Sequence, residues 1–212
     1  LIKYLVKDAK ERNKKIQVCA LTGCASVLLG CSAKTVHSWA NIGLASGDSN
    51  KIVDRVVKSK YKKKAWQDVD ILIIDEVSMM SVKLFEILDD IGRRIRFIPH
   101  LPFGGIQIVF SGDFHQLPPV GNKDEPETEQ FCFESSKWSS SIEETICLTT
   151  IFRQSDPLYA KILNEIRVGK LYKSSFNKLQ ECIGKKFDDI IIPTILLPRR
   201  RDVDKINERE LA

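Results

Sequence analysis

The sequence lacks a long apolar run and a signal for secretion. None of its 212 residues fall in a stretch that approaches the roughly 20 consecutive apolar residues of a membrane-spanning helix. The amino terminus has no hydrophobic region of the secretory type. We therefore expect a protein that acts inside the cell and has no membrane partner.

Metal-binding and disulfide patterns are also missing. The six cysteines contain no C-x-x-C pair, and the three histidines stand at no metal-ligand spacing from them. This predicts free thiols in a reducing compartment.

The composition is that of an ordinary globular protein, with 43% hydrophobic and 29% charged residues. The net charge of +5 is unevenly distributed. Residues 1–64 carry fourteen Lys and Arg against four Asp and Glu, whereas the remainder carries nineteen against twenty-four. A basic surface can attract a polyanion such as nucleic acid. Solvated lysines on a helix and loop explain the same excess equally well.

The clearest chemical signal is the segment I-L-I-I-D-E-V-S-M-M at residues 71–80. Four β-favouring apolar residues predict a strand buried on both faces, as in a parallel sheet covered by helices. Asp75 and Glu76 follow where that strand ends, which is where ligands bind in open α/β sheets. One carboxylate can hold Mg²⁺ through its waters, and the other can orient or deprotonate an attacking water. The alternative is a solvated acidic turn.

Residues 106–120 repeat this arrangement. A second apolar run, residues 106–110, predicts a strand that ends in a polar turn carrying Gln116. The amide of Gln116 can bond both a phosphate oxygen and a water. Arg153 follows a third predicted strand, residues 145–148, and its guanidinium suits a phosphate whose charge grows in a transition state. A Gly-rich turn and a surface salt bridge are the respective alternatives.

The remaining pattern alternates strands and helices, which predicts an α/β fold with a mainly parallel sheet. We expect further strands at residues 16–21 and 194–197. A lysine-rich loop is expected after residue 58, and a disordered or variable acidic loop at residues 121–130. The expected helices are at residues 1–13, 23–29, 52–58, 84–95, 158–168, 176–182 and 201–211.

Several motifs, in order, resemble those of the PIF-type DNA helicases of superfamily one. They are D-E-V-S-M, G-G-I-Q-I-V-F-S-G-D-F-H-Q-L-P-P-V, I-F-R-Q and L-N-E-I-R-V-G. The segment from T-G-C-A to T-V-H-S-W-A-N-I-G-L, residues 22–44, is similar to the family's region after its phosphate loop. The ending L-P-R-R-R-D-V-D-K-I-N resembles the opening of the family's second motor domain.

The resemblance implies a RecA-like phosphate-loop NTPase core in residues 1–148 and the start of a second RecA-like domain in residues 149–212. It also implies ATP and Mg²⁺ as cofactors. By this resemblance Asp75 holds the magnesium, Glu76 activates the water, Gln116 senses the γ-phosphate and Arg153 is an arginine finger from the second domain.

The same resemblance implies a helicase that moves 5′-to-3′ on single-stranded DNA and acts at duplex junctions, in repair, recombination or telomere maintenance. In a eukaryote it would act in the nucleus and also in mitochondria. Thr35, His37, Ser38 and Trp39 would contact the single strand. Helix capping and core packing are the alternative for His37 and Trp39. No stable protein partner is indicated.

One family motif, the phosphate loop G-x-x-x-x-G-K-[ST], is absent from the sequence. The resemblance places it just before Leu1, so we expect the chain to be a fragment that lacks ATPase activity by itself. Two alternatives remain open: another phosphate-loop NTPase, and a decayed mobile-element remnant that only binds DNA.

Overall fold

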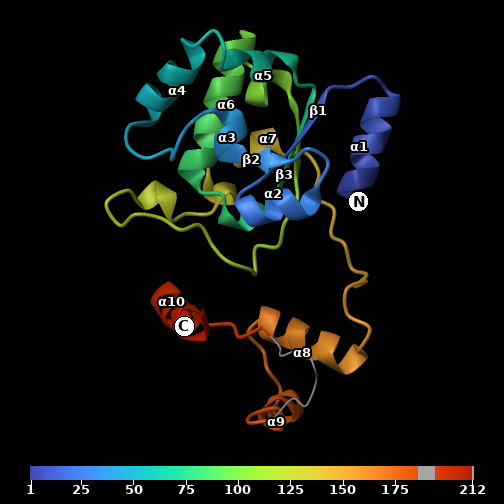
Figure 1. The fold of residues 1–212 in the computed structure, drawn as a ribbon. Helices are drawn as coiled ribbons and strands as arrows, with labels where there is room; N and C mark the ends of the chain where they lie inside the picture. The colour runs from blue at the N-terminus through green and yellow to red at the C-terminus, as the bar shows by residue number, and fades with distance from the viewer. Residues whose placement is uncertain (186–193, 212) are drawn as a thin grey trace. The chain divides into compact units, whose positions relative to one another are not determined.

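The computed structural model describes residues 1–185 and 194–211, and its chain divides into two units, Leu1–Arg153 and Gln154–Ala212. The first unit is built on a four-stranded sheet in which all neighbours are parallel, in the order β2-β1-β3-β4 (Figure 1). In that order the strands span Lys34–Thr35, Ile16–Ala20, Ile71–Asp75 and Gln107–Phe110. The predicted α/β fold with a parallel sheet is confirmed.

Strand β3 is the centre of the sheet. It pairs with β1 on one side, where Ala20 aligns with Asp75, and with β4 on the other, where Phe110 aligns with Ile74. Leu72, Ile73 and Ile74 are all fully buried. A strand covered on both faces has no polar side, which is why its sequence shows no alternation.

Helices cover both faces of this sheet. On one face, Leu72 and Ile74 pack in a large core with side chains of four helices, whereas Ile73 and Val18 pack on the other face with Val6 of α1. The four helices are α3 (Val36–Ala40), α4 (Ser49–Val57), α5 (Lys63–Asp68) and α6 (Val82–Arg96). Helix α1 spans Ile2–Glu11, α2 spans Gly23–Leu29 and α7 spans Trp138–Ser141.

Helix α6 is the longest element and follows the predicted apolar stripe. Its start is capped by Ser81, whose hydroxyl accepts a hydrogen bond from the Leu84 N–H at 3.2 Å. Every member of the stripe (Leu84, Leu88, Ile91 and Ile95) is buried. Three arginines in the last turn add favourable charge at the negative end of the helix dipole.

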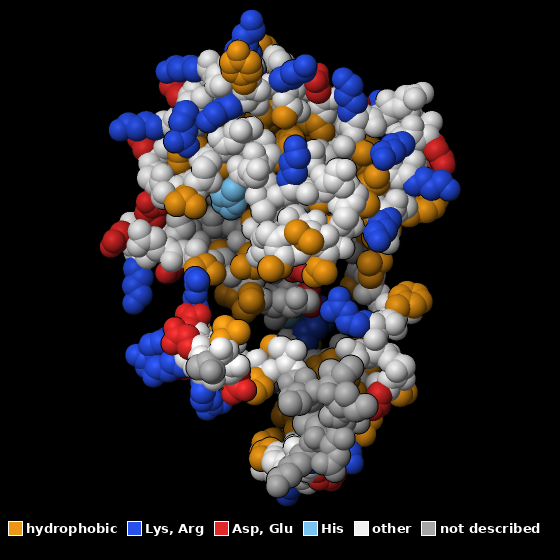
Figure 2. All heavy atoms as spheres, in the orientation of Figure 1, with side chains coloured by type: hydrophobic (Ala, Val, Ile, Leu, Met, Phe, Trp, Pro, Cys, Tyr) orange, Lys and Arg blue, Asp and Glu red, His pale blue; other side chains and the backbone are white. Residues whose placement is uncertain are grey.

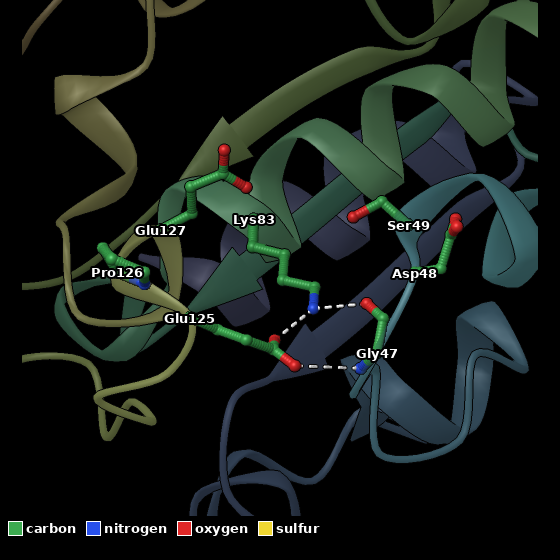
Figure 3. Close-up of a pocket in the computed structure, with 7 residues that line it drawn as sticks. All are labelled: Gly47, Asp48, Ser49, Lys83, Glu125, Pro126 and Glu127. Atoms are coloured by element: carbon green, nitrogen blue, oxygen red, sulfur yellow. Dashed lines mark hydrogen bonds and ion pairs between the residues drawn. The ribbon is translucent and has the colours of Figure 1, made fainter.

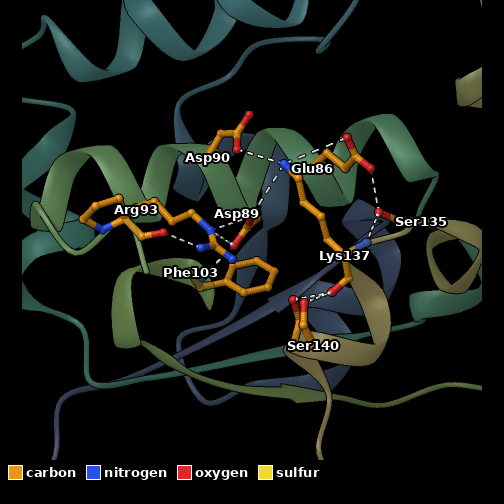
Figure 4. A network of polar contacts seen from close by, with 10 residues as sticks. Glu86, Asp89, Asp90, Arg93, Phe103, Ser135, Lys137 and Ser140 are labelled. Carbon is orange, nitrogen blue, oxygen red and sulfur yellow. Dashed lines mark hydrogen bonds and ion pairs between the residues drawn. The ribbon is translucent and has the colours of Figure 1, made fainter. Parts of the chain in front are cut away.

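A buried carboxylate fastens α6 to the turn before β4 (Figure 4). Asp89 is fully buried, accepts from Arg93 Nε at 2.8 Å and accepts from the Phe103 N–H at 2.7 Å. The backbones approach closely here, because a Cβ on Gly92 would lie 2.5 Å from the Phe103 carbonyl oxygen. Lys137 bonds the neighbouring Asp90 at 3.0 Å.

Two predicted strands are wrong. Residues 145–148 and 194–197 form neither helix nor strand. Ile146 and Leu148 are 79% and 72% exposed, and Leu196 is 90% exposed. A strand needs a paired neighbour, and in the described part of the chain neither segment has one. The second unit is described by three helices, α8 (Pro157–Arg167), α9 (Lys173–Gln180) and α10 (Arg200–Leu211), close to the predicted ranges.

The lysine-rich stretch after residue 58 is also more ordered than predicted. Instead of a continuous loop it contains α5, whose Trp66 is fully buried.

All six cysteines are free, as expected. Cys19 and Cys132 are buried, and burial raises the pKa of each thiol to about 12, so they act as packing groups. Within residues 1–185 and 194–211, no helix has the length and apolar character required to cross a bilayer.

The Asp89 contacts generate a stability prediction. Asp89→Ala leaves the buried Phe103 N–H and Arg93 Nε without their acceptor, so the free energy of unfolding should fall by about 3–5 kcal/mol. Tryptophan fluorescence in a urea titration measures this in the first unit, since all three tryptophans lie there.

The matched control is Asp90→Ala, on the adjacent residue, whose side chain is 44% exposed. It should cost less than about 1 kcal/mol, as partly exposed ion pairs do. Equal losses for the two variants would contradict the role given to Asp89.

Candidate active site

The turns that follow β3 and β4 are hydrogen-bonded to each other. The Ser111 N–H donates to the Ile74 carbonyl at 2.9 Å, and the Val77 N–H donates to the Ser111 carbonyl at 3.0 Å. Gly112 continues this contact, because a Cβ on it would lie only 2.8 Å from the Val77 nitrogen. The absence of a side chain at Gly112 therefore lets the two predicted site segments meet at one edge of the sheet.

Glu76 lies in this contact with a left-handed backbone, φ 59° and ψ 39°. That conformation costs a non-glycine residue on the order of 1–3 kcal/mol, and Glu76 is one of eight non-glycine residues with positive φ in the described part of the chain. It ends β3 and starts the 3-10 turn at Val77–Met79. The carboxylates of Asp75 and Glu76 are half-buried, and neither makes a hydrogen bond or ion pair with the described residues.

Gln116 is exposed and folds back onto its own turn. Its N–H donates to the Asp113 carbonyl at 2.8 Å, and its Nε2 donates to Asp113 Oδ2 at 3.3 Å. The His115 N–H also donates to Asp113, at 3.1 Å. Asp113, which was not among the predicted site residues, thus fixes the turn that carries Gln116. Asp side chains commonly bond the backbone N–H two residues on in turns, as Asp113 does with His115, and this was the available signal.

Asp75 fits a magnesium site of the expected kind. The described residues contain no cluster of three or more His, Cys, Asp or Glu able to hold a metal. Mg²⁺ is commonly held by one or two carboxylates, with waters and substrate phosphates completing its shell. A single half-buried carboxylate at the end of β3 meets that requirement.

Among the described residues, no contact brings Arg153 to this edge. It is exposed, it follows a segment without regular structure, and it is the last residue of the first unit. The predicted domain boundary at residue 148 places Arg153 in the second domain, whereas the division of the structure places it in the first unit. Its proposed role as an arginine finger stays a prediction.

The predicted nucleic-acid segment forms the start of α3. The Thr35 hydroxyl accepts from the Ser38 N–H at 3.2 Å and so caps the helix. Ser38 is exposed and His37 is half-buried, and burial lowers the pKa of His37. Trp39 is only 5% exposed and lies 4.6 Å from Trp66 between ring centroids. This burial supports the packing alternative for Trp39, and its predicted contact with DNA stays a prediction.

A buried lysine that the sequence analysis missed joins the segment between α3 and α4 to the loop beyond Gln116 (Figure 3). Lys83 is 7% exposed, donates to the Gly47 carbonyl at 2.5 Å and pairs with Glu125, which also accepts from the Gly47 N–H at 3.3 Å. The hydrogen bond from Lys83 lowers the pKa of Glu125. No local pattern marks such a pair, because its partners are 42 residues apart.

The Lys83 contact also orders the acidic loop at residues 121–130. That loop was expected to be disordered or variable, but it contains a 3-10 turn at Pro126–Thr128 and a hydrogen bond from the Asn122 N–H to the Thr128 hydroxyl at 2.7 Å. A neighbouring cavity of about 220 Å³ is lined by His37, Lys83 and Val120, among others. The turn after Gln116 and the segment around His37 thus border one space.

Comparisons with known proteins agree with these motifs. The chain is 41% identical over 201 residues to the ATP-dependent DNA helicase RRM3 of Saccharomyces cerevisiae, covering 94% of this chain and 27% of that protein. It is 34% identical over 193 residues to the ATP-dependent DNA helicase PIF1 of Homo sapiens, covering 91% and 29%. The chain therefore spans little more than a quarter of these relatives.

Solved structures give the same result. The Pif1 helicase of Candida albicans matches with a TM-score of 0.86 and 35% identity, covering 99% of this chain and 46% of that one. A Bacteroides Pif1 bound to ssDNA matches with a TM-score of 0.82 and 28% identity, covering 99% and 50%. The family model for PIF1-like helicases matches residues 1–175, and on this evidence the chain belongs to the PIF1-like helicase family.

Proposed function

We propose that this chain is part of an ATP-driven DNA helicase, in which hydrolysis at the β3–β4 edge moves the protein 5′-to-3′ along single-stranded DNA. The observation that carries the proposal is the contact between the Asp75–Glu76 turn and the Gly112–Gln116 turn. It brings two carboxylates and an amide to one edge of a parallel sheet, which supports the proposal. The relatives named as ATP-dependent DNA helicases support the proposal of helicase activity.

Each group has a distinct task in the proposed reaction. Bound Mg²⁺, held by Asp75 through water, would neutralise phosphate charge. Glu76 takes the proton of a water as that water bonds to the γ-phosphorus, and the bond from this phosphorus to the β-phosphate oxygen breaks. Gln116 would exchange its bond to Asp113 for one to the γ-phosphate. Arg153 would stabilise the charge that develops there.

The proposed partners are single-stranded DNA and duplex junctions, met by His37 and Ser38 at the start of α3. The proposed processes are DNA repair, recombination and telomere maintenance, in the nucleus and mitochondria of a eukaryote. His37 and Val120 line one cavity, so DNA bound at the start of α3 would lie near the turn after Gln116.

Exchanging Glu76 for glutamine tests the hydrolytic site. Glu76→Gln keeps size and polarity but removes the proton acceptor, so ATP turnover should fall by about 10²–10⁴-fold while nucleotide binding persists. The assay needs a protein that joins this chain to a phosphate-binding loop. Asp75→Asn should instead weaken Mg²⁺-dependent nucleotide binding.

The matched control for this test is Glu11→Gln. Glu11 is an exposed glutamate on α1, the helix that covers the face of the sheet away from α3–α6. It should leave turnover unchanged. Undiminished hydrolysis in Glu76→Gln would remove Glu76 from the mechanism.

DNA binding generates a separate prediction. Affinity for an oligo-dT strand should fall steeply with salt, because phosphate contacts release counterions. His37→Ala should weaken binding at every salt concentration without altering the slope of log K against log salt. The reason is that burial lowers the pKa of His37 and so favours its neutral form.

The control here is His100→Ala, an exposed histidine beyond the carboxyl end of α6. It should bind as the unaltered protein does. An affinity independent of salt, or an equal effect of the two histidine variants, would argue against a DNA contact at α3.

A further inference from the structure

The sequence K-S-K-Y-K-K-K at residues 58–64, here called the lysine segment, places five lysines around one tyrosine. Tyr61 is 92% exposed, although an aromatic side chain normally buries most of its surface. The segment joins α4 to α5, and Figure 2 shows Lys and Arg side chains gathered over the part of the first unit where Figure 1 draws these helices.

Most of this positive charge has no compensating carboxylate. Lys58 pairs with Asp54 at 2.9 Å, but within the described residues no ion pair engages Lys60, Lys63 or Lys64. Lys63 and Lys64 occupy the first turn of α5, the end of a helix at which cations are unfavourable. The lysines therefore repel one another and the helix end, and helix stability does not account for them.

The lysine segment is nevertheless held in a defined place. Trp66, a few residues later, is fully buried against Trp39 of α3. Lys62 Nζ donates to the carbonyl of Asn41, the residue that ends α3, at 3.4 Å. Two independent contacts thus fix the segment beside the carboxyl end of α3.

The lysine segment and the proposed DNA contacts lie at opposite ends of the short helix α3. It has five residues, which corresponds to about 7.5 Å of helix. Ser38 is exposed on α3, and Asn41 at its end meets Lys62. A DNA strand that contacts His37 and Ser38 therefore reaches the lysine segment if it continues along α3.

Lysines beside an exposed aromatic ring match the chemistry of single-stranded nucleic acid. The ammonium groups neutralise backbone phosphates, and the ring stacks on an unpaired base whatever its sequence. A duplex offers the phosphates but keeps its bases stacked on one another, so the exposed Tyr61 favours the single strand.

We propose that the lysine segment is a second binding site for single-stranded DNA, continuous with α3, in which Lys60, Lys63 and Lys64 contact phosphates and Tyr61 stacks on a base. This inference rests on the proposed function, and it extends the DNA-binding surface beyond the family motif at residues 35–44.

Two kinds of variant separate charge from stacking. Replacing Lys60, Lys63 and Lys64 together by Gln should lower the affinity of the full chain for oligo-dT at least about 10-fold at low salt. It should also reduce the salt slope by about 2, since each single-strand phosphate contact contributes about 0.7. Tyr61→Ala should lower affinity by about 5- to 150-fold with an unchanged slope. Tyr61→Phe should retain it.

The matched control removes three exposed lysines from the other face of the sheet. Lys3, Lys10 and Lys14 lie on or next to α1, are exposed and make no ion pair in the described part of the chain. Replacing these three by Gln changes the net charge equally but should alter affinity less than about 2-fold. Circular dichroism confirms that each variant remains folded.

The outcomes distinguish this inference from the proposed function. Suppose that His37→Ala weakens binding, but that neither Tyr61→Ala nor the triple lysine variant loses more affinity than the α1 control. The proposed site at the lysine segment is then wrong, and the α3 contact stands. If those variants lose affinity only for a blunt duplex, the single-strand assignment is wrong. If the unaltered chain binds no oligo-dT, both the inference and the proposed DNA contact fail.

Discussion

The hydrogen-bonded contact between the turns after β3 and β4 is the constraint on which the candidate site depends. Ser111 bonds the backbone on both sides of Asp75 and Glu76, at Ile74 and at Val77. Gly112 is required because any side chain would meet the Val77 backbone. Without this close approach, the turn that carries the two carboxylates and the turn that carries Gln116 would lie farther apart. The left-handed backbone of Glu76 is held between β3, which is paired on both sides and buried at its centre, and the Val77 N–H, which bonds the Ser111 carbonyl.

The same sheet places the proposed nucleic-acid segment near the proposed hydrolytic edge. Helix α3 begins directly after β2 and packs through Trp39 on α5, while Lys83 ties the loop beyond Gln116 to Gly47, which lies between α3 and α4. A change at α3 thus has a packed and hydrogen-bonded connection to the turn of Gln116. Coupling between distant sites requires a physical connection of this kind together with an element that has two arrangements.

Sequence patterns predicted the elements whose burial is strong and local. The run at β3 and the stripe of Leu84, Leu88 and Ile91 on α6 correspond directly to buried positions. Helix α5 was missed because Trp66 is the one buried residue in a short helix that begins with lysines, so no apolar periodicity marks it. Residues 145–148 have β-favouring side chains, but propensity alone does not supply a neighbouring strand. The Lys83–Glu125 pair depends on tertiary packing, and so does the burial of Trp39 against Trp66.

The central claim is that Glu76 and Gln116 act as one unit at the β3–β4 edge. A double-mutant cycle tests it directly, with single-turnover ATP hydrolysis measured for Glu76→Gln, Gln116→Ala and the pair, in a protein that also supplies a phosphate loop. Groups that act as a unit are strongly non-additive, so the double variant should hydrolyse ATP no more than about 10-fold more slowly than the slower single variant. A rate loss equal to the product of the two single losses would show that the residues act independently, and would contradict the account.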